Sequence, residues 1–434
     1  MKILSYKDAD FAAMARSMKR RAVPTDALRE AVASIIQEVS VQGDQALLHF
    51  TEKFDGAKLS ASQLFVSPQE FAEAADQVAE STRAAIAASL RNIHDFAQRS
   101  KRQDWSRKNA QGAVVGERFT PFDRVGVYVP GGKAPLVSTA LMTAGFAQAI
   151  GVPEILAATP VGADGKVNPS LLFALSQAGA TQILKVGGAQ AIAAMALGTE
   201  SVLPVDRIFG PGNRFVVEAK RQLVGAVSID LLPGPSEILI LSDRSGNPDC
   251  IAADILAQAE HGGDSMVGFL TDSKSLLNRV VKSVEKQSAA LSRSKIIAEV
   301  LEKGTFLLHV KSMAQGMELV NDFAPEHLSL IAEEEDHWLA LTRTAGAIYL
   351  GNASPVAVGD FLAGPSHTLP TGGAGRSFSG LRADQFQRRT SIVKMDLKAV
   401  KKSMPYTDEF ARIEGLDAHG KSVSIRLDSG LADS

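Results

Sequence analysis

Residues 125–159 read VGVYVPGGKAPLVSTALMTAGFAQAIGVPEILAAT, and this stretch determines the fold class that we expect. An apolar run at 125–129 predicts a short buried strand, the small residues at 130–135 predict a turn, and an Ala-rich segment to about residue 149 predicts a helix. A second apolar run, EILAAT at 154–159, predicts the next strand. Strand, helix and strand in this order predict a parallel βαβ unit.

The same alternation continues along most of the chain. Further apolar runs that predict strands lie at 182–186, 207–209, 237–242, 266–271, 306–310 and 346–350. Helical patterns lie between these runs and also fill residues 24–56 and 68–98. After about residue 381 the chain becomes charged and helical, and SVSIRL at 422–427 resembles a strand. The sequence therefore predicts an α/β protein with parallel sheets.

Composition excludes several classes of protein. The length of 434 residues predicts two to four domains, and the formal net charge of -2 without a long basic run argues against nucleic-acid binding. The longest apolar stretches are interrupted by polar residues, so we expect no membrane span. The N-terminus lacks an apolar signal core, so we expect a cytoplasmic location. Cys250 is the single cysteine, which excludes an internal disulfide and a thiolate metal cluster within one chain.

One irregular stretch, GDFLAGPSHTLPTGG at 359–373, holds an acid and an imidazole among small residues. Its glycines and prolines recur too often for a regular helix or strand. Ordering a long loop costs conformational entropy, so such a stretch in a compact protein is often functional. A turn-rich connector in which Asp360 and His367 cap backbone groups explains the stretch equally well.

Small residues also follow several of the predicted strands, in VPGGKAP, VGGAQA and GPGN. Gly210 and Gly212 match the first part of a dinucleotide-binding fingerprint, but Phe215 stands where a third glycine belongs. The fingerprint is therefore incomplete. Because such turns meet at the carboxyl ends of parallel strands, they still favour a nucleotide or another small polar ligand.

Gln258 and His261 are the first candidate metal ligands. They lie one helical turn apart, so both side chains can reach one point, although a helix C-terminus capped by glycine also explains the pattern. Asp360 could add an oxygen ligand, and His367 or His419 a second nitrogen. A nitrogen and oxygen set without thiolate suits Zn²⁺, with Mn²⁺ or Co²⁺ as substitutes.

Glu326 and His327 are the candidate acid–base pair. They follow Pro325 in FAPEHLSL, and in an irregular segment both could face a cleft. Histidine titrates near neutral pH and can act as a general base, while a nearby carboxylate can handle water. A surface turn is the alternative. Cys250 stands at an expected helix start without a second catalytic signal, so we expect it to be inert rather than a nucleophile.

These segments, taken in order, resemble the histidinol dehydrogenase family over nearly the whole chain. The motifs that carry the resemblance are VGVYVPGGKAPLVSTALM, KVGGAQAIAAMALGTE, VDRIFGPGNRFVVEAKR, IDLLPGPSEILILSD, ADILAQAEHGGDS, FAPEHLSL, SPVAVGDFLAGPSHTLPTGG and EGLDAHGKSV. The resemblance implies two successive NAD-dependent oxidations that convert L-histidinol into L-histidine through the aldehyde and its hydrate.

The same resemblance implies roles for individual residues. Zinc, one ion per subunit, would be bound by Gln258, His261, Asp360 and His419. His327 would act as general base and Glu326 would activate water. Ser236, His367 and Glu414 would contact the substrate, together with the metal ligands and His327. Tyr128, Gln190 and Asn213 would contact NAD.

The resemblance further implies two Rossmann-like, doubly wound domains. Residues 24–125 with 238–381 would form the first, which carries the metal and acid–base residues, and residues 126–237 would form the second, which binds NAD. An N-terminal arm (1–23) and a C-terminal helical extension (382–434) would complete a domain-swapped homodimer with shared active sites.

A few residues depart from the family's pattern near the expected pocket. Val356-Ala357-Val358, Leu232-Pro233 and Phe361 replace residues that are more usual there. A paralogue with the same chemistry on another small polyol or amino alcohol, such as a sulfonated diol, is therefore the main alternative. A metal-dependent hydrolase that uses Glu326 to activate water is a second alternative, and a non-catalytic binding module a third.

Overall fold

The computed structural model describes residues 1–20, 24–131 and 135–428. They form two compact units, the first made of residues 1–99 and 123–382, and the second of residues 100–122 and 383–434. Part of the expected turn at 130–135 falls on 132–134, which lies outside the described residues. The same holds for the ends of the expected arm and extension, at 21–23 and 429–434.

Five parallel strands form one sheet of the first unit, in the order β6-β5-β4-β7-β8. They are β4 (Arg124–Tyr128), β5 (Glu154–Ala158), β6 (Gln182–Leu184), β7 (Arg207–Phe209) and β8 (Ser228–Ile229). The connecting helices are α6 (Val137–Ile150), α7 (Pro169–Gln177), α8 (Gly188–Leu197) and α9 (Arg214–Leu223). The expected strand, helix and strand of residues 125–159 are confirmed, and the strand order is that of a doubly wound sheet.

Six parallel strands form the second sheet, in the order β1-β11-β10-β9-β12-β13. They are β1 (Lys2–Ser5), β9 (Glu237–Ser242), β10 (Met266–Thr271), β11 (Thr305–His309), β12 (His327–Ile331) and β13 (Ala347–Leu350). Apart from β1 at the edge, these strands repeat the order of the first sheet, a likeness that is not evident in the sequence. The segment 327–331, expected to be irregular, is a buried strand.

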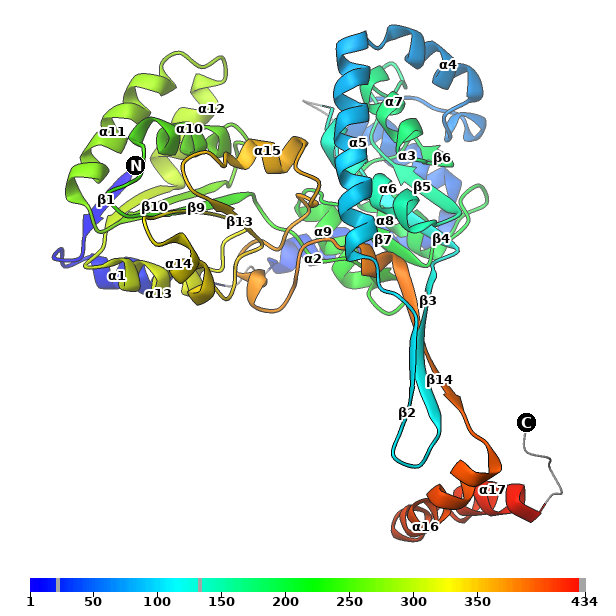
Figure 1. Cartoon of the computed structure of the whole chain (residues 1–434). Coiled ribbons are helices and arrows are strands. Elements are labelled where there is room, and N and C mark those ends of the chain that lie inside the picture. The colour runs from blue at the N-terminus through cyan, green and yellow to red at the C-terminus, as the bar shows by residue number, and fades with distance from the viewer. Residues whose placement is uncertain (21–23, 132–134, 429–434) are drawn as a thin grey trace. The chain divides into compact units, whose positions relative to one another are not determined.

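Helices cover both faces of the six-stranded sheet (Figure 1). One face carries α10 (Pro248–Ala259), α11 (Lys274–Ser288) and α12 (Ser294–Lys303), and the other carries α1 (Phe11–Ser17), α13 (Met313–Phe323) and α14 (Glu335–Leu341). Side chains of β9 alternate between these layers, with Ile238 and Ile240 in one hydrophobic cluster and Leu239 and Leu241 in the other. Burial on both faces explains why this strand is a continuous apolar run.

The N-terminal helices are placed differently from our expectation. We expected residues 24–125 to join 238–381, but α2 (Asp26–Gln42) and α3 (Asp44–Asp55) share a hydrophobic cluster with the five-stranded sheet. Val32 of α2 and Phe50 of α3 lie in that cluster beside Tyr128 of β4. The amphipathic pattern of these helices predicts a buried face without specifying which sheet covers it. The first unit also contains α4 (Pro68–Gln77), α5 (Glu80–Ser100), α15 (Val356–Phe361) and the 3-10 turns Ala61–Gln63 and Ala374–Arg376.

The second unit combines a three-stranded antiparallel sheet with two helices. Its elements are β2 (Trp105–Lys108), β3 (Val114–Pro121), the 3-10 turn Ala383–Phe386, β14 (Gln387–Lys394), α16 (Leu397–Glu414) and α17 (Asp417–Asp428). The strand expected at 422–427 is wrong, because these residues belong to α17. Alternating serine and apolar residues imitate a strand, whereas Gly420 lets α17 pack closely against Ala411 of α16.

Across the described residues, no helix is both long and apolar enough to cross a membrane.

Candidate active site

The Glu326–His327 pair lies at the amino end of β12, beside the start of β9. Helix α13 ends at Phe323, and Ala324 then adopts a left-handed conformation with φ 52. Among the described residues, Ala324 alone has a positive φ without being glycine. A left-handed alanine is strained, and such strain is typical of positions where the surrounding structure must direct a functional side chain. Pro325 follows and leads into the pair.

The backbone of Glu237 contacts both members of the pair. Its N–H donates a hydrogen bond to Oε2 of Glu326 at 2.7 Å, and its carbonyl oxygen lies 2.9 Å from Nδ1 of His327. A carbonyl can only accept, so Nδ1 of His327 carries a proton. In the neutral imidazole, Nε2 is then the basic nitrogen. Nε2 is buried without a hydrogen-bond partner among the described residues, and Oδ1 of Asp360 lies 3.6 Å away.

Burial and neighbouring charges change the acidity of the pair. Burial raises the pKa of Glu326 to about 8, against the opposing effect of His327. Burial lowers the pKa of His327, but the carboxylates of Glu326 and Asp360 outweigh it and raise that pKa to about 9. A carboxyl group with a pKa near neutrality can exchange protons with water at physiological pH, which suits it to general acid–base catalysis.

Asp360 and His367, from the irregular stretch 359–373, both reach this site. Asp360 lies in the last turn of α15, and its backbone oxygen is 3.0 Å from Nδ1 of His367. The other ring nitrogen of His367 lies 3.0 Å from Oγ1 of Thr139 in α6. Burial would raise the pKa of Asp360, but His327, with smaller effects from His367 and His261, lowers it. The lowered pKa favours a charged Asp360 carboxylate beside His327, while His367 contacts a backbone oxygen as the connector alternative expects.

Gln258 and His261 lie at the C-terminal end of α10. The helix ends at Ala259, and the N–H of His261 donates to the carbonyl of Gln258 at 3.2 Å, so the spacing of one turn continues past the helix end. Gln258 is buried, and its side-chain Nε2 has no partner among the described residues. Burial lowers the pKa of His261, with an opposing effect from Asp360, although the residue as a whole is exposed by its accessible area.

The donors in this part of the first unit fit a zinc ion. Burying an amide without a hydrogen-bond partner costs folding free energy. Rotating the side-chain amide by half a turn exchanges its oxygen and nitrogen, so the oxygen could take the position of the unpartnered nitrogen. The amide of Gln258, the imidazole of His261 and the carboxylate of Asp360 form a nitrogen and oxygen set that zinc accepts. Within the described residues, no group of three or more His, Cys, Asp or Glu side chains is arranged to hold a metal. A fourth ligand would have to come from elsewhere.

A cavity of about 760 Å³ brings together residues with three different expected roles. Asn213, Ser236 and His261 line it, and so do Pro24 and Thr25. Asn213 also caps α9, because its Oδ1 accepts hydrogen bonds from the N–H groups of Phe215 and Val216 at 2.9 and 3.2 Å. Its amide nitrogen is left to contact a ligand. This cavity therefore joins one residue expected to contact NAD, one expected to contact the substrate and one expected to bind the metal, whereas Glu326, His327 and Asp360 do not line it.

The family model of histidinol dehydrogenase matches residues 18–427 of the chain. This chain belongs to the histidinol dehydrogenase family. The histidinol dehydrogenase of Syntrophotalea carbinolica is 42% identical over 428 residues, which cover 98% of this chain and 99% of that protein. The enzyme of the same name from Halalkalibacterium halodurans is 42% identical over 404 residues, covering 93% and 95%.

A solved structure of a family member agrees in fold. The crystal structure of histidinol dehydrogenase from Elizabethkingia anophelis has a TM-score of 0.93 and 34% identity, and the match covers 99% of this chain and 98% of that one. The salicylaldehyde dehydrogenase of Pseudomonas putida G7 has a TM-score of 0.51 at 13% identity, with 88% of each chain covered, and shares the general fold alone.

The residues expected to contact NAD in this family gather at the carboxyl ends of the five-stranded sheet. Tyr128 ends β4, and its hydroxyl accepts a hydrogen bond from the N–H of Gly188 at 3.0 Å. Gln190 follows in α8, fully buried, with an Oε1 that has no partner among the described residues. Burial raises the pKa of Tyr128 to about 12, so the hydroxyl stays protonated at neutral pH.

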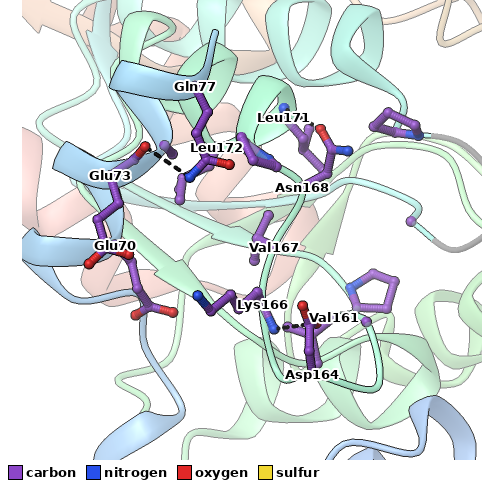
Figure 2. A pocket seen from close by; sticks show the side chains of 16 residues that line it. Glu70, Glu73, Gln77, Val161, Asp164, Lys166, Val167, Asn168, Leu171 and Leu172 are labelled. Atoms are coloured by element: carbon purple, nitrogen blue, oxygen red, sulfur yellow. Dashed lines mark hydrogen bonds between the residues drawn. The ribbon is translucent and has the colours of Figure 1, made fainter.

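A second cavity, of about 460 Å³, lies between α4 and residues 160–172 (Figure 2). Glu70 and Glu73 approach it from α4, and Lys166 faces them from the other side. Glu70 is already paired with Lys185 at 2.9 Å. None of the site residues expected for the family lines this cavity, so we assign it no part in the chemistry.

Glu414 and His419, the remaining expected site residues, belong to the second unit. Glu414 ends α16, His419 lies in the first turns of α17, and both are exposed. Because they belong to a different unit from the other expected ligands, their roles stay predictions. Cys250 is exposed at the start of α10.

Glu237 and Tyr349 are site residues that the sequence did not reveal. Glu237 stands first in the otherwise apolar strand EILILS, and a buried acid at that position is a signal that could have been noticed. Tyr349 of β13 lies with its ring centroid 6.1 Å from that of His327. A Cβ on Gly359 would collide with its hydroxyl, so glycine is needed one residue before Asp360.

Proposed function

We propose that this member of the histidinol dehydrogenase family oxidises L-histidinol to L-histidine in two NAD-dependent steps, through L-histidinaldehyde and its hydrate. The observation that carries the proposal is the buried Glu326–His327 pair, fixed by the backbone of Glu237 and in contact with Asp360. A basic imidazole nitrogen and a carboxyl group of raised pKa in one pocket fit the two different proton transfers of a four-electron oxidation.

His327 acts as the general base in this proposal. Its proton on Nδ1 is held toward the Glu237 carbonyl, so Nε2 is the nitrogen that exchanges a proton. Because the pKa of His327 is raised to about 9, the ring must first lose its Nε2 proton, and the neutral ring then takes the alcohol proton while the carbinol carbon loses a hydride. The same nitrogen can take a proton from the hydrate in the second oxidation. The buried position excludes bulk water from the transferred proton.

Glu326 activates the water that converts the aldehyde into its hydrate. Cys250 lies exposed at the start of α10, outside the buried pair, so a thiohemiacetal route has no nucleophile in the described site. Adding water across the aldehyde carbonyl gives the hydrate. Its C–H hydrogen, already present in the aldehyde, can then leave as the second hydride while one hydroxyl loses its proton to form the carboxyl group. The raised pKa of Glu326 lets its carboxyl group accept and return a proton near neutral pH.

Two bound groups complete the chemistry. NAD would supply the hydride acceptor for each oxidation, and zinc would supply a Lewis acid that orients the substrate. Tyr128, Gln190 and Asn213 would hold NAD, and Gln258, His261 and Asp360 would hold zinc together with His419. The unpartnered amides of Gln190 and Gln258 are consistent with both assignments. Ser236, His367 and Glu414 would contact the substrate.

We further propose a homodimer in which the partner subunit's Glu414 and the partner subunit's His419 complete each site. The second unit exposes large apolar side chains on α16, namely Tyr406, Phe410 and Ile413, each more than 60% exposed. Side chains of this kind favour a protein interface. Replacing Phe410 by aspartate should shift the protein toward monomers in sedimentation, whereas an unchanged dimer, or a monomeric wild type, would contradict the proposal.

The substrate is tested by comparing NADH formation from L-histidinol with that from small diols, including a sulfonated diol. Turnover of L-histidinol alone is expected. If no NADH forms from L-histidinol but NADH forms from a diol, the chain is a paralogue with another substrate instead. A hydrolase on the same fold would consume its substrate without NAD, so product formation in NAD-free buffer would overturn the oxidoreductase assignment.

A further inference from the structure

We infer that Arg20, from the N-terminal segment, is a positioning residue for the Glu326–His327 pair, and that it acts through Glu237. This inference rests on the proposed function and adds a residue to it. Arg20 touches neither member of the pair. Its effect would be to hold the one residue whose backbone contacts both.

The carboxylate of Glu237 is almost completely buried, with 3% of its side chain exposed. Its Oε1 accepts a hydrogen bond from the N–H of Gly372 at 3.0 Å and forms an ion pair with Arg20. Its Oε2 has no hydrogen-bond partner among the described residues. A buried carboxylate without a countercharge is strongly destabilising, so the Arg20 guanidinium is required to keep this group charged and in place.

Arg20 also touches the segment that leads into the pair. Its guanidinium carbon lies 3.6 Å from the centroid of the Phe323 ring, the stacked geometry of a cation–π contact. Phe323 is the last residue of α13, directly before the strained Ala324. The Arg20 side chain therefore contacts two elements: the start of β9, through Glu237, and the end of α13, through Phe323. The first contacts Glu326 and His327, and the second leads into them.

The end of the 359–373 stretch and the residues just after it also contact Glu237 and Arg20. Gly372 donates to the Glu237 carboxylate, and Arg376 donates to the backbone oxygens of Arg20 and Gly373 at 3.4 and 3.1 Å. Four chain segments thus meet at one ion pair. Residues 1–20 are therefore part of the active-site structure as well as of the six-stranded sheet, and not only an arm.

The matched control is Lys19, the preceding residue. Its side chain is 72% exposed, and it pairs with Asp322 at 3.8 Å on the surface. Exposed pairs of this kind contribute little, so Lys19→Ala should leave turnover unchanged. Arg20→Met removes the charge but keeps the length of the side chain, and Arg20→Lys keeps the charge but loses the planar stacking on Phe323.

The test is a double-mutant cycle on Arg20 and Glu237. Arg20→Met is expected to lower kcat for both oxidations by at least about tenfold, with little change in KM for NAD. Arg20→Lys should lower kcat less than Arg20→Met does, because it keeps the positive charge. Adding Glu237→Gln to Arg20→Met should recover most of the loss, because no buried charge is then left unpaired, while the backbone groups of Glu237 remain.

Two results would overturn the inference. One is an Arg20→Met protein that is folded and has wild-type kcat, and the other is a folded double variant without recovery. Should Arg20→Met not fold, Glu237→Gln is compared with the double variant. Removing Arg20 from Glu237→Gln should then lower kcat by less than about twofold. A further loss of about tenfold in kcat would refute a role exerted through Glu237.

Failure of the proposed function gives a different result, namely a wild-type protein that forms no NADH from L-histidinol. The inference is then still decided by the NMR signal of the proton on Nδ1 of His327. That signal should shift or broaden in Arg20→Met, because the Glu237 carbonyl that accepts it is displaced. An unchanged signal would overturn the inference.

Discussion

Nε2 of His327 and Oδ1 of Asp360 lie 3.6 Å apart, although 33 positions separate the two residues in the sequence. His327 begins a strand of the six-stranded sheet, whereas Asp360 lies in the last turn of α15. The distance is too long for a hydrogen bond, and it places the proposed base beside a proposed metal ligand. Proton transfer and substrate orientation would therefore occur at one place.

The two members of the acid–base pair should have separable effects. His327→Gln should lower kcat for both oxidations by about 10²- to 10⁴-fold, because both need a base. Glu326→Gln should lower aldehyde oxidation more than alcohol oxidation, because only the second step needs activated water. Stopped-flow measurement of NADH, started from the alcohol or from the aldehyde, distinguishes the steps. Equal losses in both steps for Glu326→Gln would contradict this division of roles.

Metal removal should abolish turnover, and added Zn²⁺ or Mn²⁺ should restore it. Gln258→Ala should lower zinc affinity by at least about tenfold, since its buried amide has no other partner in the described structure. Gln69→Ala on the surface of α4 is the control and should bind zinc as the wild type does. Full activity of rigorously metal-free protein would refute a role for zinc.

The left-handed Ala324 should tolerate glycine but not a β-branched residue. Ala324→Val should destabilise the protein by at least about 1–3 kcal/mol, because a β-branched side chain is strongly disfavoured at positive φ and the site is fully buried. Ala324→Gly should stay within about 1 kcal/mol of the wild type. Urea unfolding measures both. A valine variant as stable as the wild type would show that the strain is absent in solution.

Asp254 of α10 should make stability depend on pH. Burial raises its pKa from 3.8 to about 6, so the folded state binds this proton more strongly than the unfolded state does. The stability that this protonated carboxyl group contributes is fully present below about pH 4, and it is lost as the pH rises through 6. Asp254→Asn should therefore stabilise the protein by about 1–2 kcal/mol at pH 8, allowing for partial solvent screening, and by less at pH 5.

The control for this effect is Asp95→Asn, on the surface of α5, where the carboxylate is 67% exposed and pairs with Arg99. The change in the free energy of unfolding that Asp95→Asn causes should not become more favourable from pH 5 to pH 8. Urea unfolding of both variants at pH 5 and pH 8 makes the comparison. A gain for Asp254→Asn that is equal at the two pH values would contradict a raised pKa.

Much of the fold could be predicted from the sequence, because its strands are buried on both faces. EILAAT and EILILS are apolar runs of strand length, and both appear as strands. His327–Ile331 was not recognised, because Pro325 and two polar residues obscure the start of the strand. The helix at 422–427 was also missed, since its packing against α16 cannot be read from local alternation.

The site could be predicted only in part. Asp360 and His327 could be named, but their meeting depends on how α15 and β12 pack, which sequence spacing does not encode. Arg20 and Glu237 could not be paired in advance, because an ion pair between residues 217 positions apart leaves no local signal. The resemblance supplied the roles of Gln258 and His419, which composition and spacing alone had left open.

The most direct test of the central claim is the stoichiometry of the full reaction. Purified protein with zinc, excess NAD and a limiting, known amount of L-histidinol should form two NADH for each L-histidinol consumed, with L-histidine as the final product by mass spectrometry. One NADH per substrate with accumulated aldehyde, or no NADH at all, would contradict it.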